Sequence, residues 1–235
     1  YYAANRPVVL LNLMNDWKAL RLWEPEYFKS SCGNETVEVM GGRNSDPRYE
    51  INSDSHRTTM LFREYIDKVT RNGDGNDYYL VANNNMFQRK GMQHLYDDIV
   101  VLPEYLDTNN LDGGVFFWFG PAGTVTPLHH DLLNVFMAQV RGRKRVTLIP
   151  SEQIHRVYND IGVYSEVDCE KPDYSEFPEF RNASIQRFVL KPGEVLFVPV
   201  GWWHHVRALD ISVTVSFTNF IFPNYYEWTH PDIRK

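Results

Sequence analysis

The chain has 235 residues and a net charge of −6, with 43% hydrophobic and 23% charged residues, values that are typical of a globular protein. Aromatic residues make up 14% of the chain, enough for a sizeable core, so the composition excludes a disordered protein. The acidic balance and the lack of a long basic run make a nucleic-acid partner unlikely on composition. At this length, a single all-β barrel or sandwich is an ordinary outcome.

The sequence shows no signal for export or membrane insertion. No apolar stretch approaches the roughly 18 residues that a membrane-spanning helix needs, and the N-terminus shows no basic-then-apolar leader pattern. Cys32 and Cys169 are too few for a disulfide scaffold and fit a reducing compartment. We therefore expect an intracellular protein, cytoplasmic or nuclear, with no membrane partner.

The first 112 residues mix short strands with short helices. The apolar run PVVLLNL predicts a buried strand, and the alternation in TVEVM predicts another. Pro25 is suited to the first position of a helix, and Leu61, Tyr65 and Val69 form a helical stripe at i, i+4 and i+8. The expected elements are strands over 7–13, 36–40 and 78–82, helices over 25–30 and 58–69, and loops over 44–56 and 71–77.

From Gly113 onward, short β-rich runs such as VFFWFG, VFMAQV and ISVTVSF are separated by Gly and Pro. Regularly spaced short strands predict a barrel or double sheet, and the lack of long helices between them disfavours a parallel doubly wound sheet. A polar insertion over 157–184 interrupts the runs. We expect one domain, with a mixed α/β cap over 1–112, a β-barrel core over 113–222 and a C-terminal tail over 223–235.

Two segments concentrate side chains that bind metal ions. In TPLHHD, His129 and Asp131 are two residues apart, so on a strand they point to one face while His130 points to the other. The segment PVGWWHHV, about 75 residues later, supplies His204 and His205. Two histidines and one carboxylate form a facial triad with open coordination positions, the arrangement of non-haem Fe(II) oxygenases. Either half alone is commonly surface or core decoration, so the prediction rests on the joint pattern.

Three longer stretches carry a family resemblance: FWFGPAGTVTPLHHD over 117–131, QVRGRKRVTLIP over 139–150 and LKPGEVLFVPVGWWHHVRALDISVTVSF over 190–217. Through them the protein resembles the Jumonji-C hydroxylases, which are cupin-like enzymes that depend on Fe(II) and 2-oxoglutarate. Within that family it is most similar to the small Jumonji-C-only arginyl and asparaginyl protein hydroxylases. The resemblance implies a mainly β fold, a double-stranded β-helix (jelly roll) of about eight strands with the N-terminal α/β cap outside it.

The resemblance also implies which residues hold the iron. The family's ligands fall on His129, Asp131 and one member of the adjacent histidine pair. Alignment of the following VRAL string favours His204, and His205 is the alternative.

Four further residues are implied as contacts of the cosubstrate 2-oxoglutarate. Lys144, Thr126 and Tyr79 match the groups that bind its distal carboxylate, although the neighbouring Tyr78 leaves the register of the tyrosine open. Asn134 is the candidate for an asparagine near its metal-binding end.

Glu38 and Trp118 are the candidate substrate contacts. The resemblance aligns Glu38 with an acidic residue that holds a substrate guanidinium, and it places Trp118 near the site. An exposed strand glutamate and a core tryptophan are the ordinary alternatives. Val81, Ala82 and Thr218 stand where relatives carry polar or aromatic residues, so we expect a pocket less polar than an arginine site.

The implied activity is that of a dioxygenase. With Fe(II), 2-oxoglutarate and O2, it would hydroxylate a C–H bond on a residue of a peptide or protein and release succinate and CO2. Arginine is the first expectation for that residue, followed by asparagine or aspartate. The alternatives are a Jumonji-type lysine demethylase, a tRNA, nucleoside or small-molecule hydroxylase, and a zinc cupin or non-catalytic binding protein. The sequence leaves the oligomeric state open.

Overall fold

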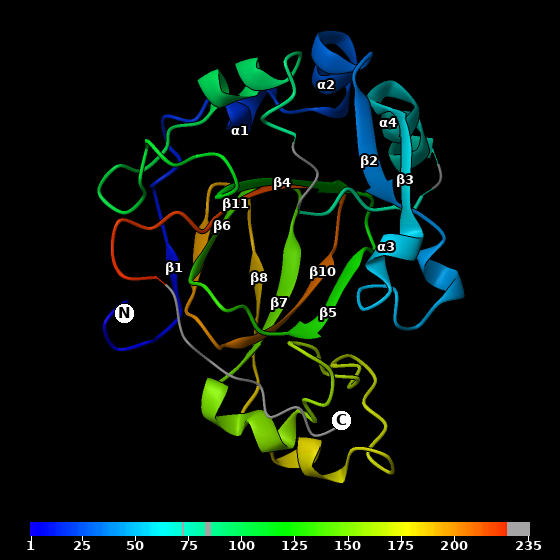
Figure 1. The fold of residues 1–235 in the computed structure, drawn as a ribbon, viewed down its shortest axis with the longest axis vertical. Helices are drawn as coiled ribbons and strands as arrows, with labels where there is room; N and C mark the ends of the chain where they lie inside the picture. The colour runs from blue at the N-terminus through cyan, green and yellow to red at the C-terminus, as the bar shows by residue number, and fades with distance from the viewer. Residues whose placement is uncertain (72, 83–85, 225–235) are drawn as a thin grey trace.

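Two antiparallel sheets that enclose a shared interior form the centre of the molecule (Figure 1). The computed structural model describes residues 1–71, 73–82 and 86–224. The five-stranded sheet has the order β1 (Val8–Leu10), β9 (Val195–Val198), β6 (Val135–Arg141), β11 (Ser212–Phe217), β4 (Val115–Gly120). The four-stranded sheet has the order β5 (Val125–His129), β10 (Trp203–Ala208), β7 (Lys144–Ile149), β8 (Gln186–Leu190). Strands β4 to β11 confirm the predicted jelly roll.

Apolar side chains from both sheets fill part of the space between them. Strand alternation directs Val146 and Leu148 of β7 inward, where they pack with Leu196 of β9. A cavity begins where this cluster ends, and Val135 and Val206 belong to both. The jelly roll is therefore a packed core in one part and a binding space in the other.

The N-terminal cap packs against the five-stranded sheet. Its helices are α1 (Ala19–Leu22), α2 (Pro25–Cys32), α4 (Phe62–Arg71) and the 3₁₀ helix η2 (Gln93–Asp98). Trp23, Phe28 and Phe62 meet Phe117 and Phe119 of β4 in edge-on or tilted ring contacts. Such aromatic pairs contribute beyond the area they bury, so the cap and the barrel share one core.

A two-stranded sheet in the cap consists of β2 (Thr36–Met40) and β3 (Arg57–Leu61). The helix expected over 58–69 is therefore wrong in its first turn and confirmed only from Phe62 onward. Thr58 and Thr59 are β-branched, and their pairing with β2 overrides the helical stripe there.

Residues 78–82, expected to form a strand, contribute two single bridges instead. Tyr79 pairs with Met40 of β2, and Leu80 pairs with Phe119 of β4. Successive side chains of an extended segment point to opposite sides. Leu80 is therefore buried in the cap core, while Tyr79 lines the cavity.

The insertion over 157–184 packs against the four-stranded sheet with apolar residues of its own. The 3₁₀ helix η3 (Ser151–Arg156) leads into the insertion and η4 (Pro178–Asn182) lies within it. Glu170 forms ion pairs with Arg145 of β7 and Arg207 of β10. The insertion thus braces the two strands that carry Lys144 and His204.

The structure departs from the remaining sequence-based expectations at several points. The loop expected over 44–56 contains part of the 3₁₀ helix η1 (Arg43–Ser45) and the whole of α3 (Ser53–His56). Strand β1 is shorter than the predicted 7–13, and it joins the barrel by pairing with β9. Of the expected tail, residues 225–235 lie outside the described residues. Among the described helices, none is both long and apolar enough to cross a bilayer.

Candidate active site

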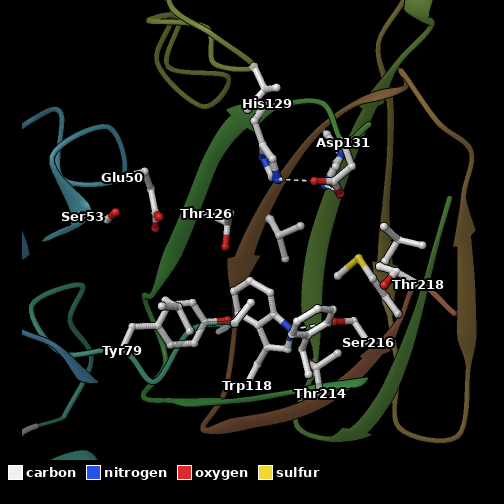
Figure 2. A pocket seen from close by; sticks show the side chains of 18 of the residues that line it. Glu50, Ser53, Tyr79, Trp118, Thr126, His129, Asp131, Thr214, Ser216 and Thr218 are labelled. Carbon is white, nitrogen blue, oxygen red and sulfur yellow. Dashed lines mark hydrogen bonds and ion pairs between the residues drawn. The ribbon is translucent and has the colours of Figure 1, made fainter. Parts of the chain in front are cut away.

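A cavity of about 420 Å³ lies between the two sheets and holds most of the predicted site (Figure 2). The predicted residues that line it are His129, Asp131, His204, Lys144, Thr126, Tyr79 and Trp118. Much of the remaining wall is apolar, with contributions from Met40, Phe116, Leu133, Val135 and Met137. Asn134 and Glu38 are not part of the wall.

His129, Asp131 and His204 form one cluster in this cavity. One ligand atom from each lies within 4.8 Å of the other two. Nε2 of His204 is 3.4 Å from Oδ2 of Asp131, and Nε2 of His129 is 4.0 Å from Oδ1. Figure 2 shows His129 and Asp131 turned toward each other at one end of the cavity. His130 lies elsewhere and packs against Trp203, as strand alternation predicts.

Backbone carbonyls orient both imidazoles. Nδ1 of His129 donates to the carbonyl of Pro127 at 2.8 Å, and Nδ1 of His204 donates to that of Trp202 at 3.0 Å. Because a carbonyl only accepts, each ring carries its proton on Nδ1 and leaves the Nε2 lone pair for a metal. Burial and the neighbouring His129 lower the pKa of His204 to about 4, so the ring is in its neutral, metal-binding form at pH 7.

A bulge where β5 pairs with β10 brings Thr126 and His129 to the same side. His204 is opposite His129 and Val206 is opposite Thr126, so β5 has two residues between these pairs where β10 has one. The extra residue lets both Thr126 and His129 line the cavity. On β10, His204 and Val206 alternate into the cavity, whereas His205 is absent from its wall.

Lys144, Tyr79 and Thr126 form a buried polar group in the same cavity. Nζ of Lys144 donates to the Tyr79 hydroxyl at 3.2 Å, and Thr126 lines the cavity beside them. Burial lowers the pKa of Lys144 to about 7 and raises the pKa of Tyr79 above its usual range. No carboxylate among the described residues forms an ion pair with Lys144, so a bound dicarboxylate fits as its missing anion.

The structure favours Tyr79 over Tyr78 at this position. The ring of Tyr79 lies against Gly120 of β4, where an added Cβ would come within 2.6 Å of it. Only glycine permits so close an approach. Tyr78 instead packs with the cap core beside Lys68.

Asn134 lies outside the cavity, so its placement beside the cosubstrate is not supported. Its Oδ1 accepts a hydrogen bond from the backbone N–H of Val200 at 2.9 Å, and its Nδ2 donates to the Tyr2 hydroxyl at 3.1 Å. Its backbone N–H donates to Oδ1 of Asn224 at 2.8 Å. These partners satisfy the buried amide within the fold.

Glu38 also lies behind the cavity wall. It forms an ion pair with Arg57, and Arg57 is the partner that lines the cavity. Arg57 also contacts Asp54 at 3.3 Å. A substrate guanidinium at Glu38 would have to replace the guanidinium already bound there.

Trp118 and the three departures from the family pattern all line the cavity. Nε1 of Trp118 donates to the Ser216 hydroxyl at 2.8 Å. Val81, Ala82 and Thr218 contribute to the wall. All four residues are therefore placed where they can contact a bound ligand.

Sequence reasoning missed Glu50, Arg43 and Tyr164. Glu50 lines the cavity and bonds with Arg43 at 2.9 Å. Tyr164, from the insertion, also lines it and stacks on His129 with ring centroids 6.0 Å apart. No motif marks these residues, because all three come from segments that resemble loops. The length of those loops was the only available signal.

Comparison with known proteins identifies the family. The profile of the cupin-like domain family matches residues 1–221. The chain is 36% identical to lysine-specific demethylase 8 of Xenopus tropicalis, over 92% of this chain and 48% of that protein. It is 34% identical to lysine-specific demethylase JMJ30 of Arabidopsis thaliana, over 92% of this chain and 50% of that protein. It is 30% identical to JmjC domain-containing protein D of Dictyostelium discoideum, over 92% of this chain and 52% of that protein.

The chain therefore belongs to the cupin-like domain family, and it spans about half the length of these curated relatives. These relatives are named as lysine-specific demethylases and as a JmjC domain-containing protein, names that point to the Jumonji-C class of Fe(II)- and 2-oxoglutarate-dependent dioxygenases. The donor set fits this class: two imidazoles with fixed tautomers and one carboxylate offer three ligands. The buried Lys144 fits the carboxylate of the cosubstrate.

Proposed function

We propose that the protein hydroxylates a C–H bond on a residue of a peptide or protein and converts 2-oxoglutarate to succinate and CO2. The carrying observation is that one cavity contains both a three-ligand metal cluster and a buried lysine that lacks a carboxylate partner among the described residues. In the balanced reaction, one oxygen atom of O2 enters the substrate and the other enters succinate. Bound Fe(II) supplies the redox chemistry.

The protein's own residues would bind the metal, orient the cosubstrate and exclude water. His129, Asp131 and His204 would hold the metal through three positions, so that its other positions would be open to cosubstrate and O2. Lys144 fixes the far carboxylate of the cosubstrate, with the Tyr79 hydroxyl as its neighbour. The apolar part of the wall limits the water that reaches the reacting groups.

Arginine is the first substrate residue that we propose, followed by asparagine or aspartate. A second candidate is lysine demethylation, since two relatives are named lysine-specific demethylases. Both activities hydroxylate a carbon, and they differ in whether that carbon belongs to the side chain itself or to an N-methyl group. An intracellular site of action is part of the proposal, and the buried free thiols Cys32 and Cys169 agree with it.

The test is a 2-oxoglutarate turnover assay with Fe(II) and peptide libraries, read by mass spectrometry. Addition of one oxygen to the side group of arginine, asparagine or aspartate supports the proposal. Loss of a methyl group from lysine, with release of formaldehyde, assigns demethylation instead. Turnover of free small molecules or nucleosides alone would overturn a protein substrate. Bound zinc without 2-oxoglutarate turnover would overturn the dioxygenase activity.

A further inference from the structure

Glu50 is a cavity carboxylate that the reaction described above does not use. Among the described residues that line the cavity, Glu50 and Asp131 are the two carboxylates, and Asp131 belongs to the metal cluster. The two lysine or arginine residues of the wall are already engaged. Lys144 lies beside Tyr79, and Arg57 pairs with Glu38 and Asp54. Glu50 is therefore the carboxylate of the wall that lies outside the metal-ligand cluster, and the Arg43 that binds its Oε1 does not itself line the cavity.

Arg43 holds the Glu50 carboxylate in place. Its guanidinium is buried, and its Nη2 donates both to Oε1 of Glu50 at 2.9 Å and to the carbonyl of Val125 at 2.7 Å. The rings of Tyr49 and Tyr79 flank it at 4.2 and 5.2 Å from their centroids. Val125 belongs to β5, the strand of His129. Glu50 is thus preorganised relative to the metal cluster, which reduces the ordering that binding requires.

Tyr164 lies near both Glu50 and the cluster of metal-ligating residues His129, Asp131 and His204. Tyr164 lines the same cavity as Glu50 and Asp131, and its ring stacks on His129 with centroids 6.0 Å apart. Figure 2 shows Glu50 at the left edge of the pocket, beside Ser53 and nearer to Thr126 than to Thr218. A fixed carboxylate beside an aromatic ring is a suitable receptor for a cation.

We infer that Glu50 determines substrate specificity by binding a positively charged group on the substrate residue, in place of Glu38. This inference rests on the proposed function, because it names the charge of the group that enters the same cavity. Glu38 is unsuited to this role because it does not line the cavity, whereas Arg57, which binds it, does.

The test compares charged and neutral isosteres in the Fe(II)-loaded protein. Four peptide libraries carry arginine, citrulline, lysine or norleucine at a fixed central position, and succinate release is measured for each. The native protein should prefer the charged over the neutral partner by about 10- to 100-fold, as one charge-assisted hydrogen bond gives. In Glu50→Gln this ratio should fall close to 1. Glu38→Gln is the matched control and should keep the native ratio.

The ratio is insensitive to a general loss of active protein, because both libraries meet the same sample. Glutamine at position 50 also retains an acceptor for Arg43, and thermal unfolding verifies the fold. An unchanged ratio in Glu50→Gln, or a ratio lost only in Glu38→Gln, would overturn the inference.

A binding measurement separates this inference from the proposed function. Protein loaded with Mn(II) and 2-oxoglutarate is titrated with n-propylguanidinium or with neutral n-propylurea, and Mn(II)-induced water relaxation reports occupancy. Tighter binding of the guanidinium, lost in Glu50→Gln, supports the role of Glu50 even if no peptide library is turned over. Equal binding of the two probes by the native protein contradicts that role, whatever the substrate.

Discussion

The two histidines of the candidate metal site are oriented by the same local contact. In each, Nδ1 donates to the carbonyl two residues earlier in the sequence, that of Pro127 for His129 and that of Trp202 for His204. The backbone of β5 and of the turn just before β10 therefore sets both tautomers without help from a distant residue. Such outer contacts raise ligand basicity and restrict ring rotation, so the site is preorganised for a metal before one binds.

Substitution of His204 and His205, one at a time, should show which of the two binds the metal. We expect His204→Gln to weaken Mn(II) binding about 100-fold or more, because it removes a ligand of the cluster. His205→Gln is the matched control, since His205 is equally buried but absent from the cavity wall. Metal titration, with circular dichroism as a check on folding, measures both. A greater metal loss in His205→Gln would show that His205 is the ligand.

Lys144 should make the affinity for 2-oxoglutarate depend on pH. Burial lowers its pKa to about 7, and only the ammonium form attracts a carboxylate. Above pH 7 the free protein loses this proton and binding must restore it, so the Kd should rise up to about tenfold per pH unit. Below pH 7 the lysine is already charged and the Kd should level off. Calorimetry of the Mn(II)-loaded protein, in two buffers of different ionisation enthalpy, measures the affinity and the proton uptake.

The matched variant is Lys144→Met, which keeps an unbranched side group without the charge. It should bind 2-oxoglutarate about tenfold or more weakly below pH 7, with a Kd that no longer varies with pH and an unchanged affinity for Mn(II). A pH dependence that persists in this variant would assign the proton to another group.

Among the elements, β5 shows how an irregularity serves the site. Pro127 lies in the bulged part of the strand, between Thr126 and His129. Proline lacks an N–H and is tolerated at bulges, while its carbonyl accepts the bond from His129. The bulge thereby directs both His129 and the Thr126 hydroxyl into one cavity.

Strand β4 should influence cosubstrate binding through a glycine. In Gly120→Ala, the new Cβ would lie 2.6 Å from Cδ2 of Tyr79 and 3.0 Å from its Cε2, so the ring must move. We expect the Kd of 2-oxoglutarate to rise about 2- to 10-fold, the range of one weakened hydrogen bond, with metal affinity unchanged. Gly75→Ala is the control, because nothing lies within 4 Å of its added Cβ. Equal effects of the two variants would contradict a specific contact.

Sequence patterns predict the elements that depend on local or strand-level periodicity. The eight jelly-roll strands and the inward direction of His129, Asp131 and Lys144 follow from alternation together with the family pattern. The strand that contains Thr58 was not predicted, because it forms by pairing with β2. The helical pattern of the local sequence does not reveal that partner.

The partners of individual residues were the less predictable part of the site. Glu38 aligns with a substrate contact, yet Arg57, distant in the sequence, occupies it in three dimensions. Asn134 has a suitable residue type, but its amide is used by Val200 and Tyr2. Glu50 lies in a loop without periodicity, so only the folded protein brings it to the cavity.

For the molecule as a whole, Asn134 joins segments from the two ends of the described sequence. It links the start of β6 to Tyr2, to Asn224 and to the turn before β10. We expect Asn134→Ala to lower the free energy of unfolding by about 1–3 kcal/mol, because it leaves buried groups without partners. Thermal and denaturant unfolding measure this loss, and Tyr2→Phe should cost less because it removes a single hydroxyl.

The same Asn134→Ala variant tests the alternative role near the cosubstrate. Once folded and loaded with Mn(II), it should bind 2-oxoglutarate with an affinity close to that of the native protein. A weakened cosubstrate affinity with unchanged stability would return Asn134 to the binding site.

The register of β5 and β10 places His129 opposite His204, although about 75 residues separate them in the sequence. Four strands, β6 to β9, and the whole insertion lie in that interval. Contacts of such long range carry a loop-closure entropy that the intervening structure must first offset, and they form slowly. A partly folded molecule can offer an ion His129 and Asp131, but not the third ligand. During refolding, tight metal binding should therefore lag behind the formation of β structure. An ion added early would stabilise the late pairing of β5 with β10 and would not initiate folding.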